Sequence, residues 1–313
     1  NGPSNTTAGP LAMLSFSLST RAWLRLGGFL VAALAYLLQA HRSLSSRAAS
    51  YVKAGHWAVV LGGSEGIGEA WAFQLAHLDM NLVLVARRLK PLEDVKEALL
   101  KSKPNIQVDL VTQDLAQLNE SRIAEMLEGR EVRLLIHNAA HVGATGSFLD
   151  ADLGSFMSSV DVNVKSVATA SYVFGNELKL RGVPGGIVLM SSIAGEVGSA
   201  YVANYAATKA YITTLSRGLS DEWWPIGVDA LACVAGATIT PTYLQSTSAG
   251  ARALIEQEPL DVVQECLANL GRTSMIVTGA LNKMATAIWT RVLPKGFATQ
   301  TIGQQTGRML GIS

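Results

Sequence analysis

The sequence predicts an α/β domain built on a doubly wound parallel sheet, and three observations lead to this fold class. The chain has 313 residues, 49% hydrophobic and 16% charged, so it can bury a large core and is not disordered or collagen-like. From residue 55 onward, short β-branched runs alternate with amphipathic stretches. The first run leads straight into a glycine-rich segment and then a helical pattern, which is typical of parallel strands covered on both faces.

The order of the predicted elements follows from the periodicity of the apolar residues. Short apolar runs predict strands at 56–61, 81–86, 106–112, 133–138, 186–190 and 228–234, with a seventh at 274–278. Amphipathic stretches predict helices between them at 67–78, 91–102, 121–127, 152–180 and 205–221. No internal repeat or linker interrupts the alternation, so we expect one domain here.

Charge and composition divide the chain into an N-terminal segment (1–54), the α/β domain (55–280) and a basic, amphipathic C-terminal tail (281–313). All 24 acidic residues lie between Glu65 and Glu265, whereas the stretches before and after carry five basic residues each and no acid. Basic, acid-free ends fit an anionic membrane surface. The alternative interpretation is that these basic residues are clustered by chance and are simply solvated.

The N-terminal segment contains a candidate membrane anchor at 22–40. Residues 26–40 are apolar except for Gln39, and helix from residue 22 onward reaches about 28 Å, close to the ~30 Å hydrocarbon core of a bilayer. This predicts a single-pass protein of the endoplasmic reticulum or a mitochondrial membrane. A cleaved secretory signal and an organellar transit peptide remain alternatives.

The two cysteines, Cys233 and Cys266, lie in apolar runs and are too few for a disulfide framework. We expect two buried, reduced thiols in a domain that faces a reducing compartment. We expect no metal site and no nucleic-acid partner.

The glycine-rich segment after the first strand is a candidate site for a dinucleotide pyrophosphate. Glycines there let the backbone approach the phosphates, and the following helix offers unpaired N–H groups at its N-terminus. The spacing is G-x-x-x-G-x-G, and a plain tight turn is the alternative. The residues concerned are Gly62, Ser64, Gly66, Ile67 and Gly68.

The same segment also spells G-x-S-x-G, the nucleophile motif of α/β-hydrolases, with Ser64 as the nucleophile. That mechanism needs a histidine late in the chain, after the nucleophile and its acid. The last histidine is His141, so the order of residues that an α/β-hydrolase needs cannot be completed and this interpretation is excluded.

With the glycine segment, five further motifs between residues 55 and 278 make the chain resemble the short-chain dehydrogenase/reductase family, with its Rossmann-like fold. Four residues depart from the family's motifs: Leu61, His137, Ala140 and Ala235. The motifs are Asp114-Leu115 for the adenine contact, His137-Asn138-Ala139-Ala140 for N-N-A-G, Asn163, Ser192 with Tyr205 and Lys209 thirteen and seventeen residues later, and Ala235-Gly236 followed by Thr240.

Tyr205 and Lys209 are four residues apart, so they share one face of a helix. An adjacent ammonium favours the phenolate, and we therefore expect Lys209 to lower the pKa of Tyr205. The resemblance implies that Tyr205 is the proton donor and that Lys209 also binds the nicotinamide ribose. It implies that Ser192 hydrogen-bonds the carbonyl oxygen and that Asn163 holds a water, while Asn138 and Thr240 belong to the cofactor site.

The residues at the end of the second predicted strand indicate whether the cofactor is NAD or NADP. Relatives that use NAD carry an acid there for the adenosine 2′-hydroxyl, whereas this chain has Ala86-Arg87-Arg88. A guanidinium from Arg87 fits a 2′-phosphate, which favours NADPH. Glu65 in the glycine segment counts against this choice, and two solvated charges are the alternative.

The segment after Thr240 is apolar and rich in small residues, which predicts an apolar carbonyl substrate. With the candidate anchor and the basic tail, the chain resembles the membrane-bound 3-ketoacyl-CoA reductase and 17-beta-hydroxysteroid dehydrogenase branch. This implies a ketoacyl, steroid or similar substrate of lipid metabolism. The tail is expected to lie on the membrane or pack on another subunit, either a second copy or a membrane-complex partner.

A second function remains open at this point. Because of the departures at Leu61, Ala140 and Ala235, the alternative is an accessory subunit of a membrane complex that keeps the fold and a bound nucleotide. The four separated polar residues Asn163, Ser192, Tyr205 and Lys209 favour an active reductase.

Overall fold

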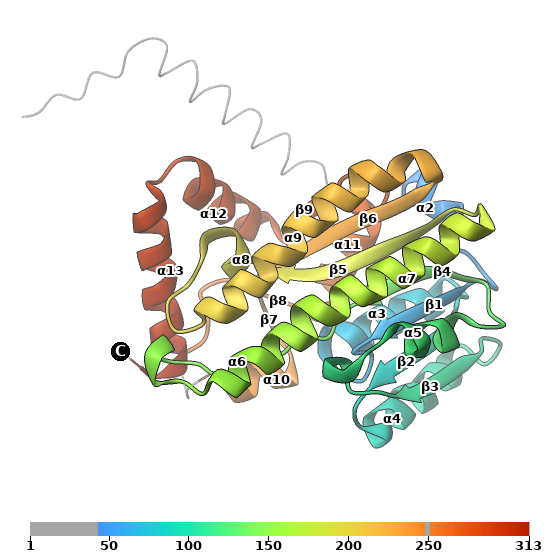
Figure 1. Ribbon diagram of the computed structural model, residues 1–313, viewed down its shortest axis with the longest axis horizontal. Helices are drawn as coiled ribbons and strands as arrows, with labels where there is room; N and C mark the ends of the chain where they lie inside the picture. The colour runs from blue at the N-terminus through green and yellow to red at the C-terminus, as the bar shows by residue number, and fades with distance from the viewer. Residues whose placement is uncertain (1–42, 248–250, 313) are drawn as a thin grey trace, which may run out of the picture. The chain divides into compact units, whose positions relative to one another are not determined.

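The computed structural model describes residues 43–247 and 251–312, all within one compact unit. Among these residues, seven parallel strands form one sheet in the order β3-β2-β1-β4-β5-β6-β9 (Figure 1). The strand order reverses between β1 and β4, which is where doubly wound sheets bind their ligands. The strands are β1 (Trp57–Leu61), β2 (Asn81–Ala86), β3 (Val108–Thr112), β4 (Val132–His137), β5 (Gly185–Ser192), β6 (Val228–Ala235) and β9 (Met275–Val277).

Helices cover both faces of the sheet, which explains why β1, β4 and β6 are buried along their whole length. Two separate apolar cores result, one on each face. One face carries α3 (Gly66–His77), α4 (Leu89–Ser102) and α11 (Pro259–Asn269). The other carries α5 (Glu120–Leu127), α7 (Ser166–Arg181) and α9 (Ala203–Trp223), the last two of which cross the front of the sheet in Figure 1.

The Rossmann-like parallel sheet expected from the sequence is confirmed, with one correction to the helix predicted at 152–180. That stretch consists of α6 (Leu153–Val160), a π-helical turn η3 (Asp161–Lys165) and α7. The side chain of Asn163, inside the turn, bonds to the backbone of His141. A π turn inside an α-helix often marks a functional position.

The C-terminal third contains elements that the periodicity did not predict. After Thr240 come α10 (Pro241–Ser246) and α11, and a two-stranded ladder joins β7 (Ala237–Thr238) to β8 (Glu256–Gln257). The tail forms α12 (Ala280–Arg291) and α13 (Lys295–Leu310), which lie beside the short helix α8 (Ile193–Val197) in Figure 1.

The anchor predicted at 22–40 lies outside the described residues. Within the part of the chain that is described, no helix combines the length and the apolar character needed to cross a bilayer.

The expectation of two free thiols is wrong. Cys233 in β6 and Cys266 in α11 are joined by a disulfide, with their Cα atoms 5.8 Å apart. Both residues are fully buried. The prediction failed because the sequence does not show that α11 packs over β6, and this packing brings residues 33 positions apart into contact.

A buried polar cluster attaches residues 45–51 to the sheet. The hydroxyl of Tyr51 donates to Asp229 Oδ2 at 2.6 Å, and Arg47 forms an ion pair with the other oxygen of the same carboxylate. Ser45 Oγ donates to the carbonyl of Leu270 at 2.6 Å. Asp229 is only 4% exposed, and Tyr51 and Arg47 supply the partners that its buried carboxylate needs.

We predict that Tyr51→Phe lowers the free energy of unfolding by roughly 1–3 kcal/mol, because it leaves one oxygen of a buried carboxylate without its donor. Urea unfolding followed by circular dichroism measures the change. Tyr172→Phe, at an exposed position on α7, is the matched control and should have almost no effect. Equal effects of the two substitutions would contradict a stabilising role for the cluster.

Candidate active site

The glycine segment between β1 and α3 packs so tightly that side chains are excluded. A Cβ on Gly62, whose φ is +86°, would lie 2.7 Å from the backbone nitrogen of Ala139, and one on Gly68 would lie 1.8 Å from the carbonyl oxygen of Gly62. Asn138 Nδ2 donates to that same oxygen at 2.9 Å. The segment is therefore held against the end of β4, with the N-terminus of α3 behind it.

A cavity of about 460 Å³ opens at the carboxyl ends of the strands and reaches the glycine segment. It is lined by residues from the N-terminal half of the sheet and by residues from β5, α9 and α10, which the fold brings together. Of the predicted site residues, those that line it are Gly62, Ser64, Gly66, Ile67, Arg87, Asp114, Asn138, Ser192, Tyr205, Lys209 and Thr240.

Tyr205 and Lys209 lie one turn apart on α9, with Lys209 Nζ 5.6 Å from the centre of the Tyr205 ring. Burial raises the pKa of Tyr205 above its ordinary value, and a hydrogen bond with Ser192 offsets part of this rise. The expected lowering of the Tyr205 pKa by the lysine is therefore not found in the cofactor-free chain. The rise caused by burial of the phenol outweighs the lowering by the Ser192 hydrogen bond.

Lys209 is itself buried, with 2% of its surface exposed, and Nζ donates to the carbonyl of Met190 at 2.7 Å. Burial lowers the pKa of Lys209 from 10.5 to about 7. A lysine in this range exchanges its proton near neutral pH, and it responds strongly to any charge placed beside it.

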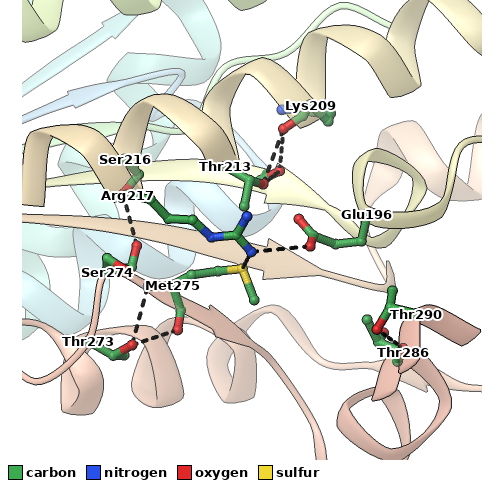
Figure 2. Close-up of polar contacts among 11 residues, drawn as sticks. Glu196, Lys209, Thr213, Ser216, Arg217, Thr273, Ser274, Met275, Thr286 and Thr290 are labelled. Atoms are coloured by element: carbon green, nitrogen blue, oxygen red, sulfur yellow. Dashed lines mark hydrogen bonds and ion pairs between the residues drawn. The ribbon is translucent and has the colours of Figure 1, made fainter. Parts of the chain in front are cut away.

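Hydrogen bonds under α9 hold the lysine's turn in place. Ser191 Oγ, at the end of β5, donates to the carbonyl of Lys209 at 2.8 Å and lies 2.9 Å from Thr213 Oγ1. Figure 2 shows the next contacts along the helix: Arg217 reaches Glu196 on α8 at 3.6 Å, and Ser216 Oγ donates to the carbonyl of Ser274. Strand β5, helix α8 and strand β9 thus all fix the position of α9.

Asn163 does not line the cavity and is fully buried. Its Oδ1 accepts from the backbone nitrogen of His141 at 2.8 Å, and its Nδ2 donates to the carbonyl of His141 at 2.8 Å and to Thr208 Oγ1 at 3.0 Å. These bonds use both ends of the amide. Asn163 therefore connects the loop after β4 with the turn of α9 that precedes Lys209.

The structure adds one residue to the set expected from the sequence, His137 at the end of β4. Ser166 Oγ donates to the carbonyl of Val162, so it accepts from His137 Nε2, 2.8 Å away. Nδ1 is buried without a hydrogen-bond partner among the described residues. Burial, with a smaller effect of the Lys209 charge, lowers the pKa of His137 to about 3. The only sequence signal was the histidine in place of the first asparagine of N-N-A-G.

The other end of the cavity is polar and charged. Arg87 and Arg88 both line it, and Arg88 Nη2 donates to Glu65 Oε2 at 3.2 Å. Thr242 Oγ1, from α10, donates to the second oxygen of the same carboxylate at 3.3 Å. Asp114 caps the next turn by accepting from the backbone nitrogen of Ala116.

The chain is similar in sequence to known proteins. Residues 56–250 match the family model described as short chain dehydrogenase. The chain is 30% identical to a 7beta-hydroxysteroid dehydrogenase of Clostridium sardiniense over 233 residues, which cover 74% of this chain and 88% of that protein. It is 28% identical to a very-long-chain 3-oxoacyl-CoA reductase of Neurospora crassa over 289 residues, 89% of this chain and 82% of that protein.

A solved structure agrees in fold. The one reported with insights into 7beta-hydroxysteroid dehydrogenase stereoselectivity aligns with a TM-score of 0.74 at 23% identity and covers 80% of this chain and 97% of that one. The family model spans more than half of the sequence, and the motifs that define the site lie within its match. The chain belongs to the short-chain dehydrogenase/reductase family.

Proposed function

We propose that the protein is an NADPH-dependent reductase that converts a carbonyl group on an apolar substrate to the alcohol. The observation that carries the proposal is the meeting of Ser192, Tyr205 and Lys209 in the cavity that begins at the glycine segment. A purely structural member of the family has no need to keep these three polar groups around an open cavity.

The residues present fit a dinucleotide. The cradle formed by Gly62, Gly66 and Gly68 leaves no room for a Cβ, so the backbone itself forms the wall to which a pyrophosphate can bind. Asp114, Asn138 and Thr240 complete this half of the cavity. The bound nicotinamide supplies the hydride.

The chain's own residues handle the proton. Tyr205 Oη is the donor to the carbonyl oxygen of the substrate, because its raised pKa keeps it protonated at neutral pH. Ser192, hydrogen-bonded to Tyr205, orients that oxygen. Lys209 Nζ stabilises the phenolate that remains after the proton transfer. The hydrogen bond from Nζ to the carbonyl of Met190 holds the lysine side chain in position.

The choice of NADPH rests on the two arginines after β2. Arg88 already shares its guanidinium with Glu65, which leaves Arg87 as the better partner for a 2′-phosphate. Glu65 is 40% exposed at its side chain, so its ion pair with Arg88 is weak and does not compete with a bound phosphate at Arg87.

The cavity supports an apolar ligand, because part of its lining is small and apolar. Lining residues of this kind include Ala140, Val142, Val162 and Ala237. The relatives named 7beta-hydroxysteroid dehydrogenase and very-long-chain 3-oxoacyl-CoA reductase support a steroid or ketoacyl substrate. A location at the endoplasmic reticulum or a mitochondrial membrane, through the predicted anchor at 22–40, is part of this proposal.

The first prediction concerns the proton donor. Tyr205→Phe should lower carbonyl reduction at least about 100-fold, because general acid catalysis contributes ~10²–10⁴-fold, while nucleotide affinity stays nearly unchanged. Turnover of 7-oxosteroids and 3-oxoacyl-CoA esters, with calorimetric titration of NADPH, measures both. Tyr211→Phe on the same helix is the control. An accessory subunit would bind nucleotide without reducing any ketone, and equal turnover in the parent and Tyr205→Phe would exclude Tyr205 as donor.

The second prediction uses the lowered pKa of Lys209. Between pH 7 and about 10, the unfolded chain binds a proton at this lysine that the folded, cofactor-free chain does not, so stability should rise with pH in this window. Below pH 7 both states are protonated and the contribution is constant. Lys209→Met should remove the rise, as measured by urea unfolding at several pH values. Identical pH profiles of parent and variant would contradict a buried, shifted lysine.

The third prediction separates phosphate recognition from general electrostatics. The parent should bind NADPH more tightly than NADH, and Arg87→Ala should remove most of the difference, because a charge-assisted bond contributes about 1.5–3 kcal/mol. Arg88→Ala, the matched control, should have a smaller effect since Glu65 shares that guanidinium. A parent that prefers NADH, or an Arg87→Ala variant that loses both nucleotides equally in fluorescence titration, would overturn the NADPH assignment.

A further inference from the structure

Helix α12 buries polar side chains and exposes several apolar ones, while Trp289 packs partly against an apolar cluster. Its buried residues are Asn282, Lys283 and Thr286. Asn282 Nδ2 donates to Gln257 Oε1 at 2.9 Å, and Lys283 forms an ion pair with Glu265. A surface helix in water normally has the opposite arrangement. The outward side of α12 is therefore suited to an apolar medium.

The exposed apolar residues of α12 and of the start of α13 are together called the α12 face. Positions 281, 284, 288 and 292 are separated by three or four residues, so they lie on one side of the helix, and residue 297 follows at the start of α13. Each side chain is between 38% and 58% exposed: Leu281, Met284, Ile288, Val292 and Phe297.

Two basic residues lie next to the apolar residues of the α12 face in the sequence. Arg291 lies on the same side of the helix as Met284 and Ile288, and Lys295 begins α13 beside Phe297. No ion pair involves either cation within the described ranges, whereas exposed Lys90 and Lys101 on α4 each pair with an acid one turn away. No acid follows Glu265 anywhere in the sequence.

We propose that the α12 face lies on an anionic membrane leaflet, with its apolar side chains at the acyl boundary and Arg291 and Lys295 at the headgroups. Exposed apolar residues flanked by unpaired cations fit such a surface. A second copy of this chain fits less well, because a two-fold contact would bring the same cations together. The inference does not depend on the reaction that the site catalyses.

The proposed contact between the α12 face and the membrane has a consequence for the active site. Helix α13 packs on α8 and the loop after it: Thr299 Oγ1 donates to the carbonyl of Val197 at 2.9 Å, and Gly303 packs against Ala200. Helix α8 directly follows Ser192. The proposed membrane side is therefore joined to the segment that carries the serine of the cavity.

A local probe on the full-length chain tests the proposal without depending on the N-terminal segment. Met284→Cys, labelled with an environment-sensitive fluorophore, provides the accessible thiol, because both native cysteines are fully buried. On phosphatidylcholine vesicles containing phosphatidylserine, its emission should shift to the blue. The shift should reverse near 1 M salt, where the Debye length falls to about 3 Å. The same label at Tyr172→Cys on α7 should not respond.

Charge substitutions provide the second arm. Arg291→Gln with Lys295→Gln should weaken the probe response to anionic vesicles about fivefold per charge, whereas Lys90→Gln with Lys101→Gln should leave it unchanged. A silent probe at 284, an equal response at 172, or equal responses to vesicles with and without phosphatidylserine would overturn the proposal. A shift that appears in detergent when protein concentration rises would show a second copy on this face and would also overturn it.

Discussion

The packing of α9 against the carboxyl end of β5 is the constraint on which the rest of the site depends. Lys209 is buried there, and its main-chain carbonyl and its ammonium both bond to β5, at Ser191 and Met190. A buried ammonium is costly unless it is bonded, so this helix cannot slide or rotate without losing these contacts. Tyr205, one turn earlier, takes its position from the same contacts.

Two further elements depend on this packing. The π turn places Asn163 so that its amide bonds to His141 on one side and to Thr208, next to Lys209, on the other. A hydrogen bond between His137 and Ser166, the residue after the π turn, also supports this turn. The loop after β4, the long interrupted helix and α9 therefore form one hydrogen-bonded unit behind the cavity, which keeps its polar wall rigid.

The first and last segments that the structure describes make their contacts outside this unit. Residues 45–51 are attached to the sheet through the carboxylate of Asp229, and α12 and α13 cover α8. Both additions combine polar contacts with some apolar packing, and in α12 the buried residues are polar while several apolar residues are exposed. A domain of this fold class does not need such an inverted helix for its core.

The amino-acid sequence was sufficient to predict the parallel sheet, most strand limits to within two residues, and the glycine segment, because β-branched runs and glycine spacing report local backbone requirements. It also singled out Ser192, Tyr205 and Lys209, because their spacing matches a motif of the family that the chain resembles. Only the tertiary structure decided the break in the helix at Asn163, the pairing of Cys233 with Cys266, the raised pKa of Tyr205 and the inward polar side of α12. Each of these depends on which distant segments pack together and how deeply they are buried, and local periodicity carries no information about either.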